Sequence, residues 1–325
     1  MEIINNPTQV DIKKAAQALK DGHLVAFPTE TVYGLGADAT NENAVSRVYS
    51  VKARPTDHPL IVHISSINQL GKWAINIPEY AIKLAEEFWP GPMTLILKRS
   101  EIAKNFITGG QENVGVRVPS HPLALALLSK FEKLGGVGVA APSANKFGLV
   151  SPTTSAAVYE ELNQSLDKGD LILDGGQTLI GIESTIIDCT SIDPVVLRPG
   201  AITLEQVKLC TGKNALINNP KIKTRTSGLL SKHYSPKSLV VLHGIALPGD
   251  GLIALSNFPT PKGVTRLSAP ESVEEFARDL YVAFRLGDYK KVKKIVVIPP
   301  VGEGLSVAII DRLGKAAGIS KNTNK

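Results

Sequence analysis

Hydrophobic residues in the first two thirds of the chain recur with two alternating spacings. Segments with apolar residues three or four positions apart predict amphipathic helices, and short aliphatic runs between them predict buried strands. The predicted helices cover residues 10–19, 42–51, 79–88 and 122–133, and the predicted strands cover residues 24–27, 60–64, 93–97, 114–118, 137–140, 171–173, 184–188 and 195–197. This alternation favours an α/β domain in which helices cover a buried sheet.

The pattern changes near Gln206. The following residues show no sustained period and are rich in Asn, Lys, Ser, Thr and Pro, which predicts a linker. Beyond it, strands are predicted at 239–242, 251–255 and 294–298, and helices at 272–286 and 306–317. We therefore expect a first domain at residues 1–205, a linker at 206–238 and a small second α/β domain at 239–325.

Composition adds the expected setting of the protein. The chain has 325 residues, of which 43% are apolar and only 5% aromatic, so its cores must be mostly aliphatic. Cys189 and Cys210 are too few for a disulfide framework, which favours a reducing, cytoplasmic compartment. The first residues lack the pattern of a signal peptide, and no apolar run is long enough to predict a membrane span.

Charge is distributed unevenly along the chain. The net charge is +6, but residues 1–205 carry 17 basic and 22 acidic side chains, whereas residues 206–325 carry 19 basic and 8 acidic ones. Residues 206–237 contain seven Lys or Arg and no Asp or Glu. Such a segment fits a solvated linker, which charge alone favours, or a contact with nucleotide phosphates or RNA.

Polar residues follow the predicted strand that ends at Phe27. In the segment FPTETVYGLGADA, Thr31 lies among hydroxyl and carboxyl side chains, and Gly34 and Gly36 permit tight backbone geometry beside a ligand. Ligands of open α/β sheets bind where strands end. A polar turn that only leaves the sheet is an equally good interpretation.

Cationic residues collect in the segment KARPTDHPLIVHI, residues 52–64. Arg54 precedes a proline, so its backbone is extended and its side chain points away from the preceding helix. Together with Lys52 it suits a polyphosphate, because a guanidinium presents a planar fork of donors. His63 lies inside the next predicted strand; a half-buried structural histidine is the commoner situation, but the neighbouring cations favour a site.

Arginine and small polar residues recur further along the chain. An unpaired buried arginine is costly, so Arg117, in a β-branched strand, either lies on an exposed edge strand or meets an anion. The segment APSANKFGLVSPTT is rich in small residues, and its Ser151 also fits a helix N-cap. Ser184 begins another strand, and Arg198 precedes another proline. This recurrence favours one pocket for an anionic ligand.

Several common motifs are absent from the sequence. It contains no G-x-x-x-x-G-K-[ST], no H-E-x-x-H, no C-x-x-C and no G-x-S-x-G. An ordinary P-loop enzyme, a zinc site and an α/β-hydrolase are therefore not expected. The segment GLGADA approaches a dinucleotide-binding pattern only weakly.

In their order, these segments resemble the YrdC-type threonylcarbamoyl-adenylate synthases over about residues 10–205. The resemblance rests on PTETVYGLGADA, KARPTDHPLIVHI, PGPMTLIL, VGVRVPSHP, APSANKFGLVSPT, GIESTIID and LRPGAI. SGLLSKHYSPKS is similar to the linker of the long, two-domain members, and GLSVAIIDRLGKAA to their last helix. The family resemblance implies a twisted open α/β sheet with a concave, positive cavity.

The resemblance also implies an activity. Members of this family are nucleotidyltransferases that convert L-threonine, bicarbonate or CO2, and ATP into L-threonylcarbamoyl-AMP and pyrophosphate. A separate transferase complex then modifies the tRNA adenosine adjacent to the anticodon, so a weak contact with tRNA is possible in this family. Mg2+ is expected to accompany ATP, and no residue of the chain is predicted as a metal ligand.

Site residues follow from the matched motifs. Those predicted to hold threonine are Thr31, His63, Arg117, Ala141 and Ser184, with Arg117 facing the carboxylate. Those predicted to contact ATP are Arg54, His58, Asn113, Ser143, Ser151, Arg198 and Tyr234. Lys52 and Arg54 are the predicted catalytic residues near the phosphates, and Tyr234 in the basic linker is expected to close over the nucleotide. Asn113 departs from the short hydroxyl residue expected there, so only a backbone contact is expected to survive.

Two other interpretations remain from the sequence. An RNA-binding protein without catalysis fits the basic last third, although the acidic first part and the scarcity of aromatic residues weigh against it. A carbamoyl-transfer domain, as in hydrogenase maturation factors, would keep the fold, but those domains lie inside larger multidomain chains.

Overall fold

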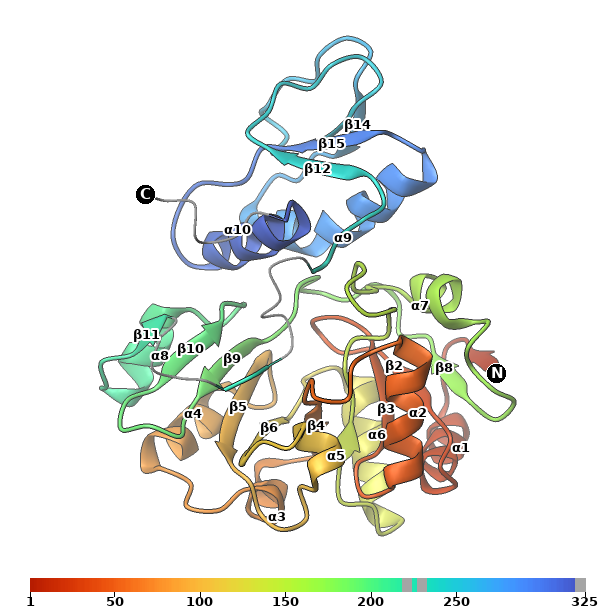
Figure 1. The fold of residues 1–325 in the computed structure, drawn as a ribbon, viewed down its shortest axis with the longest axis vertical. Helices are drawn as coiled ribbons and strands as arrows, with labels where there is room; N and C mark the ends of the chain where they lie inside the picture. Colours follow the sequence, from red (N-terminus) through yellow and green to blue (C-terminus); the bar gives the residue numbers. More distant parts are fainter. Residues whose placement is uncertain (218–223, 227–232, 319–325) are drawn as a thin grey trace.

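Two β-sheets organise the protein in the computed structural model, which describes residues 1–217, 224–226 and 233–318 (Figure 1). Within these residues the first sheet has eleven strands in the order β1-β8-β2-β3-β7-β4-β6-β5-β9-β10-β11, and the second has four in the order β12-β15-β13-β14. The first sheet contains β1 (Glu2–Ile4), β2 (Val25–Phe27), β3 (Gly34–Asp38), β4 (Ile61–His63), β5 (Met93–Lys98), β6 (Asn113–Arg117), β7 (Val139–Ala140), β8 (Leu171–Leu173), β9 (Thr185–Asp188), β10 (Val195–Arg198) and β11 (Leu216–Ile217). The second contains β12 (Leu239–Leu242), β13 (Gly251–Ile253), β14 (Thr265–Ser268) and β15 (Lys294–Val297).

Helices connect these strands and cover the sheets. In the first part of the chain they are α1 (Gln9–Lys20), α2 (Glu42–Lys52), the 3-10 helix η1 (Ile67–Gln69), α3 (Leu70–Trp73), α4 (Glu79–Phe88), α5 (Asn105–Thr108), α6 (Pro122–Lys133), α7 (Ser155–Leu162) and α8 (Leu204–Thr211). The second sheet is accompanied by α9 (Val273–Tyr289) and α10 (Leu305–Ala316). The predicted fold class, a twisted open sheet with a smaller second α/β unit, is confirmed.

The segment after β2 differs from the prediction. It forms a β-hairpin, because Gly34–Asp38 is a strand that pairs antiparallel with β2. Thr29 closes the turn, since its Oγ1 accepts from the Thr31 and Val32 amides and donates to the Val32 carbonyl at 2.7 Å. Gly36 is required by packing, because an added Cβ would lie 2.7 Å from Val139 Cγ1. The glycines were expected in a loop beside a ligand, and Gly36 instead lets two strands approach closely.

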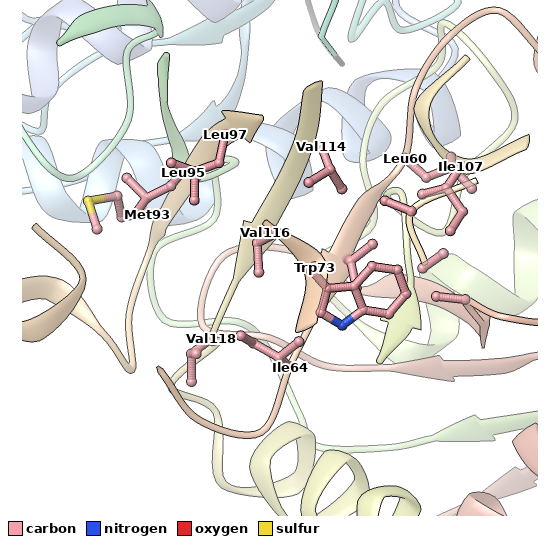
Figure 2. Close-up of a cluster of buried hydrophobic side chains, with 14 of the residues drawn as sticks. Leu60, Ile64, Trp73, Met93, Leu95, Leu97, Ile107, Val114, Val116 and Val118 are labelled. Carbon is pink, nitrogen blue, oxygen red and sulfur yellow. The ribbon is translucent and has the colours of Figure 1, made fainter. Parts of the chain in front are cut away.

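Alternation along the central strands separates the two faces of the first sheet. Val114, Val116 and Val118 point into the main hydrophobic core, where they pack with Trp73 and Leu95 (Figure 2). Side chains at the intervening positions of the same strands point to the opposite face. One face of the sheet therefore packs into this core, and the opposite face, here named the polar face, carries His63 and Arg117 beside smaller apolar clusters that include Ile96 and Ile186.

The second α/β unit lies against the first through its helices. Figure 1 shows α9 and α10 between the second sheet and the first part of the molecule. Val32, Val150 and Ile182 of the first unit share a buried apolar cluster with residues of these helices. Gly181 allows the approach, because an added Cβ would lie 2.4 Å from the Arg278 Cα. The two units are thus joined by an apolar contact as well as by the chain.

The described part of the predicted linker contains regular structure at its start. Helix α8 and strand β11 lie between residues 204 and 217, and β11 pairs with β10 at the edge of the first sheet. The basic segment continues through 218–223 and 227–232, which lie outside the described residues. Among the described residues, no helix has the length and apolar character needed to cross a membrane.

Candidate functional site

One hollow lies over the polar face of the first sheet, beside the docked second unit. It encloses about 610 Å³ of space, part of which is open to solvent. Ten residues predicted from the sequence line it, namely Thr31, Lys52, Arg54, His63, Arg117, Ala141, Ser143, Ser184, Arg198 and Tyr234. The strand register explains part of this convergence, because His63 on β4 is paired with Arg117 on β6. His63 and Arg117 are the last residues of these two strands, so the hollow lies where strands end, as the sequence suggested.

Lys52 and Arg54 lie on either side of the turn that ends α2. Ala53 between them adopts a left-handed conformation with φ 51°, which ends the helix. The Lys52 ammonium is buried and donates to the carbonyls of Ser143 and Asn145. Burial and the neighbouring guanidinium place the pKa of Lys52 well below its ordinary value, and burial lowers the pKa of Arg54 to about 10. Both groups are thus desolvated cations beside a loop of backbone oxygens, and an anionic ligand would stabilise their charged forms.

Arg117 is buried in the centre of the sheet, so the edge-strand alternative does not apply. Its Nη2 donates to Glu30 Oε1 at 2.6 Å, both Nη atoms lie 3.1 Å from Thr31 Oγ1, and Nε donates to the Gly91 carbonyl. Glu30 also accepts from the Ser120 amide at 3.0 Å. The expected anion is therefore a carboxylate of the chain itself, which fixes the guanidinium at the wall of the hollow.

Ser184 and Arg198 form a second fixed group. Arg198 Nε donates to the Ser184 carbonyl at 3.0 Å and its Nη2 to Ser184 Oγ at 3.1 Å. The Ser184 hydroxyl also shares a 2.9 Å hydrogen bond with the hydroxyl of Thr94 on β5. These contacts hold the loop before β9 in place, so a guanidinium and a hydroxyl face the hollow together.

Two histidines in the wall of the hollow are neutral at pH 7. Burial and then the charge of Arg117 lower the pKa of His63 to about 3, and burial likewise lowers that of His233 to about 3. The Nδ1 atoms of both rings are buried and have no hydrogen-bond partner within the described residues. His63 is therefore a buried histidine, as the commoner expectation had it, but one ring nitrogen has no partner within the described residues. Both rings are uncharged polar groups in the wall of the hollow.

Three predicted ATP contacts lie outside the lining of the hollow. The His58 ring packs edge-on against Phe147 with centroids 5.1 Å apart, and its carbonyl accepts from Arg54 Nε at 3.3 Å. Asn113 lines a separate small hollow beside residues 224–226. Ser151 is not the expected N-cap, which is Thr154, and its hydroxyl donates to Glu183 Oε1. The roles assigned to these three residues stay predictions.

Sequence reasoning missed several polar residues at or behind the wall, His233 among them. Asn145 and Glu183 line the hollow, and both lie inside segments singled out above. Tyr281 and Arg312 come from α9 and α10 and reach Glu183 from the second unit. The only sequence signal for α10 was the similarity of GLSVAIIDRLGKAA to the last helix of the two-domain family members. No local pattern in the sequence indicates a contact between residues more than 90 positions apart.

Four cationic side chains line a hollow whose lining carboxylate, Glu183, is already bonded to Arg312, and this lining defines a protein that binds a small anionic ligand. Comparison of the sequence with models of known protein families identifies the family to which this anion-binding protein belongs. Residues 17–200 match the family model of the Sua5, YciO and YrdC proteins, described as "Telomere recombination", and residues 202–318 match the model described as "Threonylcarbamoyl-AMP synthase, C-terminal domain". The chain therefore belongs to the threonylcarbamoyl-AMP synthase family, and it is an enzyme of threonylcarbamoyl-AMP synthesis.

Individual relatives match over almost the whole chain. The threonylcarbamoyl-AMP synthase of Pyrococcus abyssi is 41% identical over 94% of both chains, and that of Bacillus subtilis is 38% identical over 98% of this chain and 95% of the relative. A crystal structure of P. abyssi Sua5 complexed with L-threonine is similar with a TM-score of 0.87 and 40% identity, covering 97% of each chain. The similarity thus includes both units.

Proposed function

We propose that this enzyme joins L-threonine, bicarbonate and ATP inside the hollow described above. Bicarbonate takes up a proton and loses water to give CO2, and the threonine amine adds to the CO2 carbon and releases a proton, which gives a carbamate. A carbamate oxygen then attacks the α-phosphorus of ATP, the bond to the β-phosphate oxygen breaks, and pyrophosphate leaves. No side chain forms a covalent bond with a substrate in these reaction steps, so the protein contributes positioning and electrostatic stabilisation.

In this proposal the threonine half of the site surrounds Arg117. Its guanidinium is held by Glu30 and Thr31 and is predicted to face the threonine carboxylate. The neutral imidazole of His63 lies beside it on the neighbouring strand and can bond the substrate without adding charge. Ala141 and Ser184 complete the predicted contacts. A complex of the P. abyssi relative with L-threonine supports threonine as the amino acid.

The nucleotide half is proposed to surround Lys52, Arg54 and Arg198. Two anions, a carbamate and a triphosphate, must meet for the reaction to occur, and cations are needed where they meet. The observation that carries the proposal is the convergence of four cationic side chains on one hollow, in which the lining carboxylate of Glu183 is already paired with Arg312. Ser143 and Tyr234 are the other predicted ATP contacts in its wall.

Mg2+ is proposed to enter with ATP. Within the described ranges no group of three His, Cys, Asp or Glu side chains could hold a metal ion. Asn145 Oδ1, however, is buried in the wall without a hydrogen-bond partner, and an amide oxygen fits the hard-oxygen preference of Mg2+. The residues present therefore fit a metal held mainly by phosphates and water, which would supply neutralisation of the departing pyrophosphate.

The basic linker is proposed to act as a lid over the nucleotide. Its described residues 224–226 lie on the polar face of the sheet, where Thr224 Oγ1 donates to Asp188 Oδ2 at 2.7 Å. Tyr234, further along, lies buried in the wall of the hollow, and no acceptor in the described part of the chain pairs with its hydroxyl. Substituting Tyr234 by Ala should weaken ATP binding, and an unchanged affinity for ATP would reject the lid.

The product is proposed to supply a transferase complex that modifies the tRNA adenosine beside the anticodon. A mixed anhydride of a carbamate and a phosphate is reactive at its carbonyl carbon, so an acceptor amine is its natural consumer. A cytoplasmic location and a weak contact of the basic residues with tRNA belong to the same proposal.

The test measures pyrophosphate release by the full chain with each substrate omitted in turn. We expect release that requires threonine and bicarbonate, and mass spectrometry should identify threonylcarbamoyl-AMP. Arg198→Met should lower the rate at least about tenfold, because it removes a cation from the hollow, whereas Arg99→Met, which removes a surface pair with Glu112, should not. Pyrophosphate release that ignores threonine would reject the proposal.

A further inference from the structure

The carboxylate of Glu183 joins the two units at the wall of the hollow. It lies two residues before β9 and accepts a 2.7 Å bond from Nε of Arg312, which is in α10 of the second unit. Tyr281 of α9 donates to the same oxygen at 3.1 Å, and Ser151 donates to the other at 2.6 Å. Both members of the ion pair are buried. Two side chains of the second unit thus complete the surroundings of a residue in the nucleotide-binding hollow.

The ion pair of Glu183 and Arg312 is not needed to hold the two units together. Removing two charges from water is costly, and a buried ion pair contributes no more than apolar packing of similar volume. The apolar contact of Val32, Val150 and Ile182 already joins the units. Burial alone would raise the pKa of Glu183, but Arg312 and Arg198 outweigh it and lower the pKa to about 2. The carboxylate is therefore ionised and compensated chiefly from the second unit.

Arg312 reaches two further segments of the wall. Its Nη2 donates to the carbonyl of Pro199 at 3.0 Å, directly after Arg198. Its guanidinium carbon also lies 5.3 Å from the ring centre of Tyr234, which stacks on Tyr281 with centroids 5.9 Å apart. One side chain of the second unit therefore contacts three separate segments that border the hollow.

We propose that Arg312, assisted by Tyr281, is a positioning residue for ATP: it neutralises Glu183 so that the triphosphate meets cations only. The proposal rests on the proposed function, because it concerns the nucleotide half of the same site. It also gives the second unit a role in catalysis. Without that unit, an ionised carboxylate would stand in the wall of a hollow that must accept a polyanion.

Loss of Arg312 should weaken the binding of ATP and leave the binding of threonine almost unchanged, because of the charges around Glu183. Arg198 is a second arginine whose charge lowers the pKa of this carboxylate. Without Arg312, Glu183 would repel the phosphates and compete with them for Arg198. The threonine half depends on Arg117, whose carboxylate partner is Glu30, so it should be little affected.

The test compares Arg312→Met with a matched control, Arg285→Met. Arg285 of α9 also pairs across the two units, with Glu161 of α7 at 3.2 Å, but it does not touch Glu183. We expect Arg312→Met to raise the KM for ATP at least about tenfold and to leave the KM for threonine within about threefold. Arg285→Met should change neither by more than about threefold.

Restoration by a second substitution separates charge from structure. In Glu183→Gln/Arg312→Met both charges are absent, and the KM for ATP should return to within about threefold of the original enzyme. Arg312→Lys should restore it in part. A double variant no better than Arg312→Met, or a control as impaired as Arg312→Met, would overturn the proposal.

Two further measurements keep the proposal open to refutation. If Arg312→Met does not fold, Glu183→Gln alone tests the proposal. Its KM for ATP should be unchanged or lower, because it removes the negative charge that would repel the phosphates. An increase above about threefold contradicts the proposal. Calorimetric titration of ATP without threonine measures the same effect independently of turnover. An enzyme that binds ATP but releases no pyrophosphate on adding threonine would refute the proposed function, while the titrations would still decide the role of Arg312.

Discussion

Arg117→Lys is the substitution that examines the threonine half most sharply. Lysine retains a positive charge opposite Glu30, so the buried carboxylate is not left unpaired. It loses the planar fork that now contacts Thr31 and the Gly91 carbonyl, together with any bidentate contact to a bound carboxylate. The variant should therefore fold and still bind threonine poorly.

The size of the effect follows from the bonds lost. A hydrogen bond to a charged group contributes about 2 kcal/mol, and loss of one such bond to the threonine carboxylate raises the Kd roughly 30-fold. The nucleotide half is centred on other cations, so the Kd for ATP should change by less than about threefold.

Calorimetric titration with L-threonine measures this directly, and threonine-dependent pyrophosphate release gives the matching KM. Arg99→Lys is the control, because Arg99 pairs with Glu112 at the surface outside the hollow. A Kd for threonine within twofold of the original value, combined with weaker ATP binding, would refute the assignment of Arg117 to the amino acid.

Three further predictions concern packing and protonation. Gly181→Ala should lower the free energy of unfolding by at least about 2 kcal/mol in urea titrations, because Gly181 has φ 81° and an added Cβ would lie 2.4 Å from the Arg278 Cα; an unchanged midpoint would contradict this. His63 has a pKa near 3 when folded and an ordinary value of 6.5, so acid favours the unfolded chain between these values; His63→Gln should reduce the loss of stability on acidification by about 1.4 kcal/mol per pH unit there, and an unchanged slope would show that His63 is not buried neutral. Trp73→Ala, at a fully buried core position, should cost about 4 kcal/mol in the same titrations, and a loss under 1 kcal/mol would place the ring outside the core.

The sequence predicted most helices and central strands because their patterns are local. Helix α4 begins and ends where its apolar period does, at Glu79 and Phe88. Strand β3 was missed because it contains two glycines, which favour turns in isolation. Only the three-dimensional packing of Val139 and Phe27 around Gly36 explains why a strand needs them. Local propensity is overridden here by a contact across about 100 residues.

The site was predicted unevenly for a related reason. Lys52 and Arg54 lie close together in the sequence, and two neighbouring cations predicted an anion-binding site. Both residues line the hollow. The pairing of Arg117 with Glu30 could not be predicted, because the carboxylate follows a different strand far away in the sequence. Ser151 was assigned as a cap from its local context, yet its hydroxyl bonds to Glu183. Periodicity predicts strands and helices, whereas the partner of a buried polar group depends on topology.

A crystal structure of the full chain with L-threonine and a non-hydrolysable ATP analogue tests the central claim most directly. The account predicts both ligands in the hollow over the polar face of the first sheet, with the threonine carboxylate at Arg117 and the phosphates at Lys52, Arg54 and Arg198. The threonine nitrogen should lie close enough to the α-phosphorus for a bridging carbamate to fit. Ligands bound at separate surfaces, or threonine away from Arg117, would contradict the account.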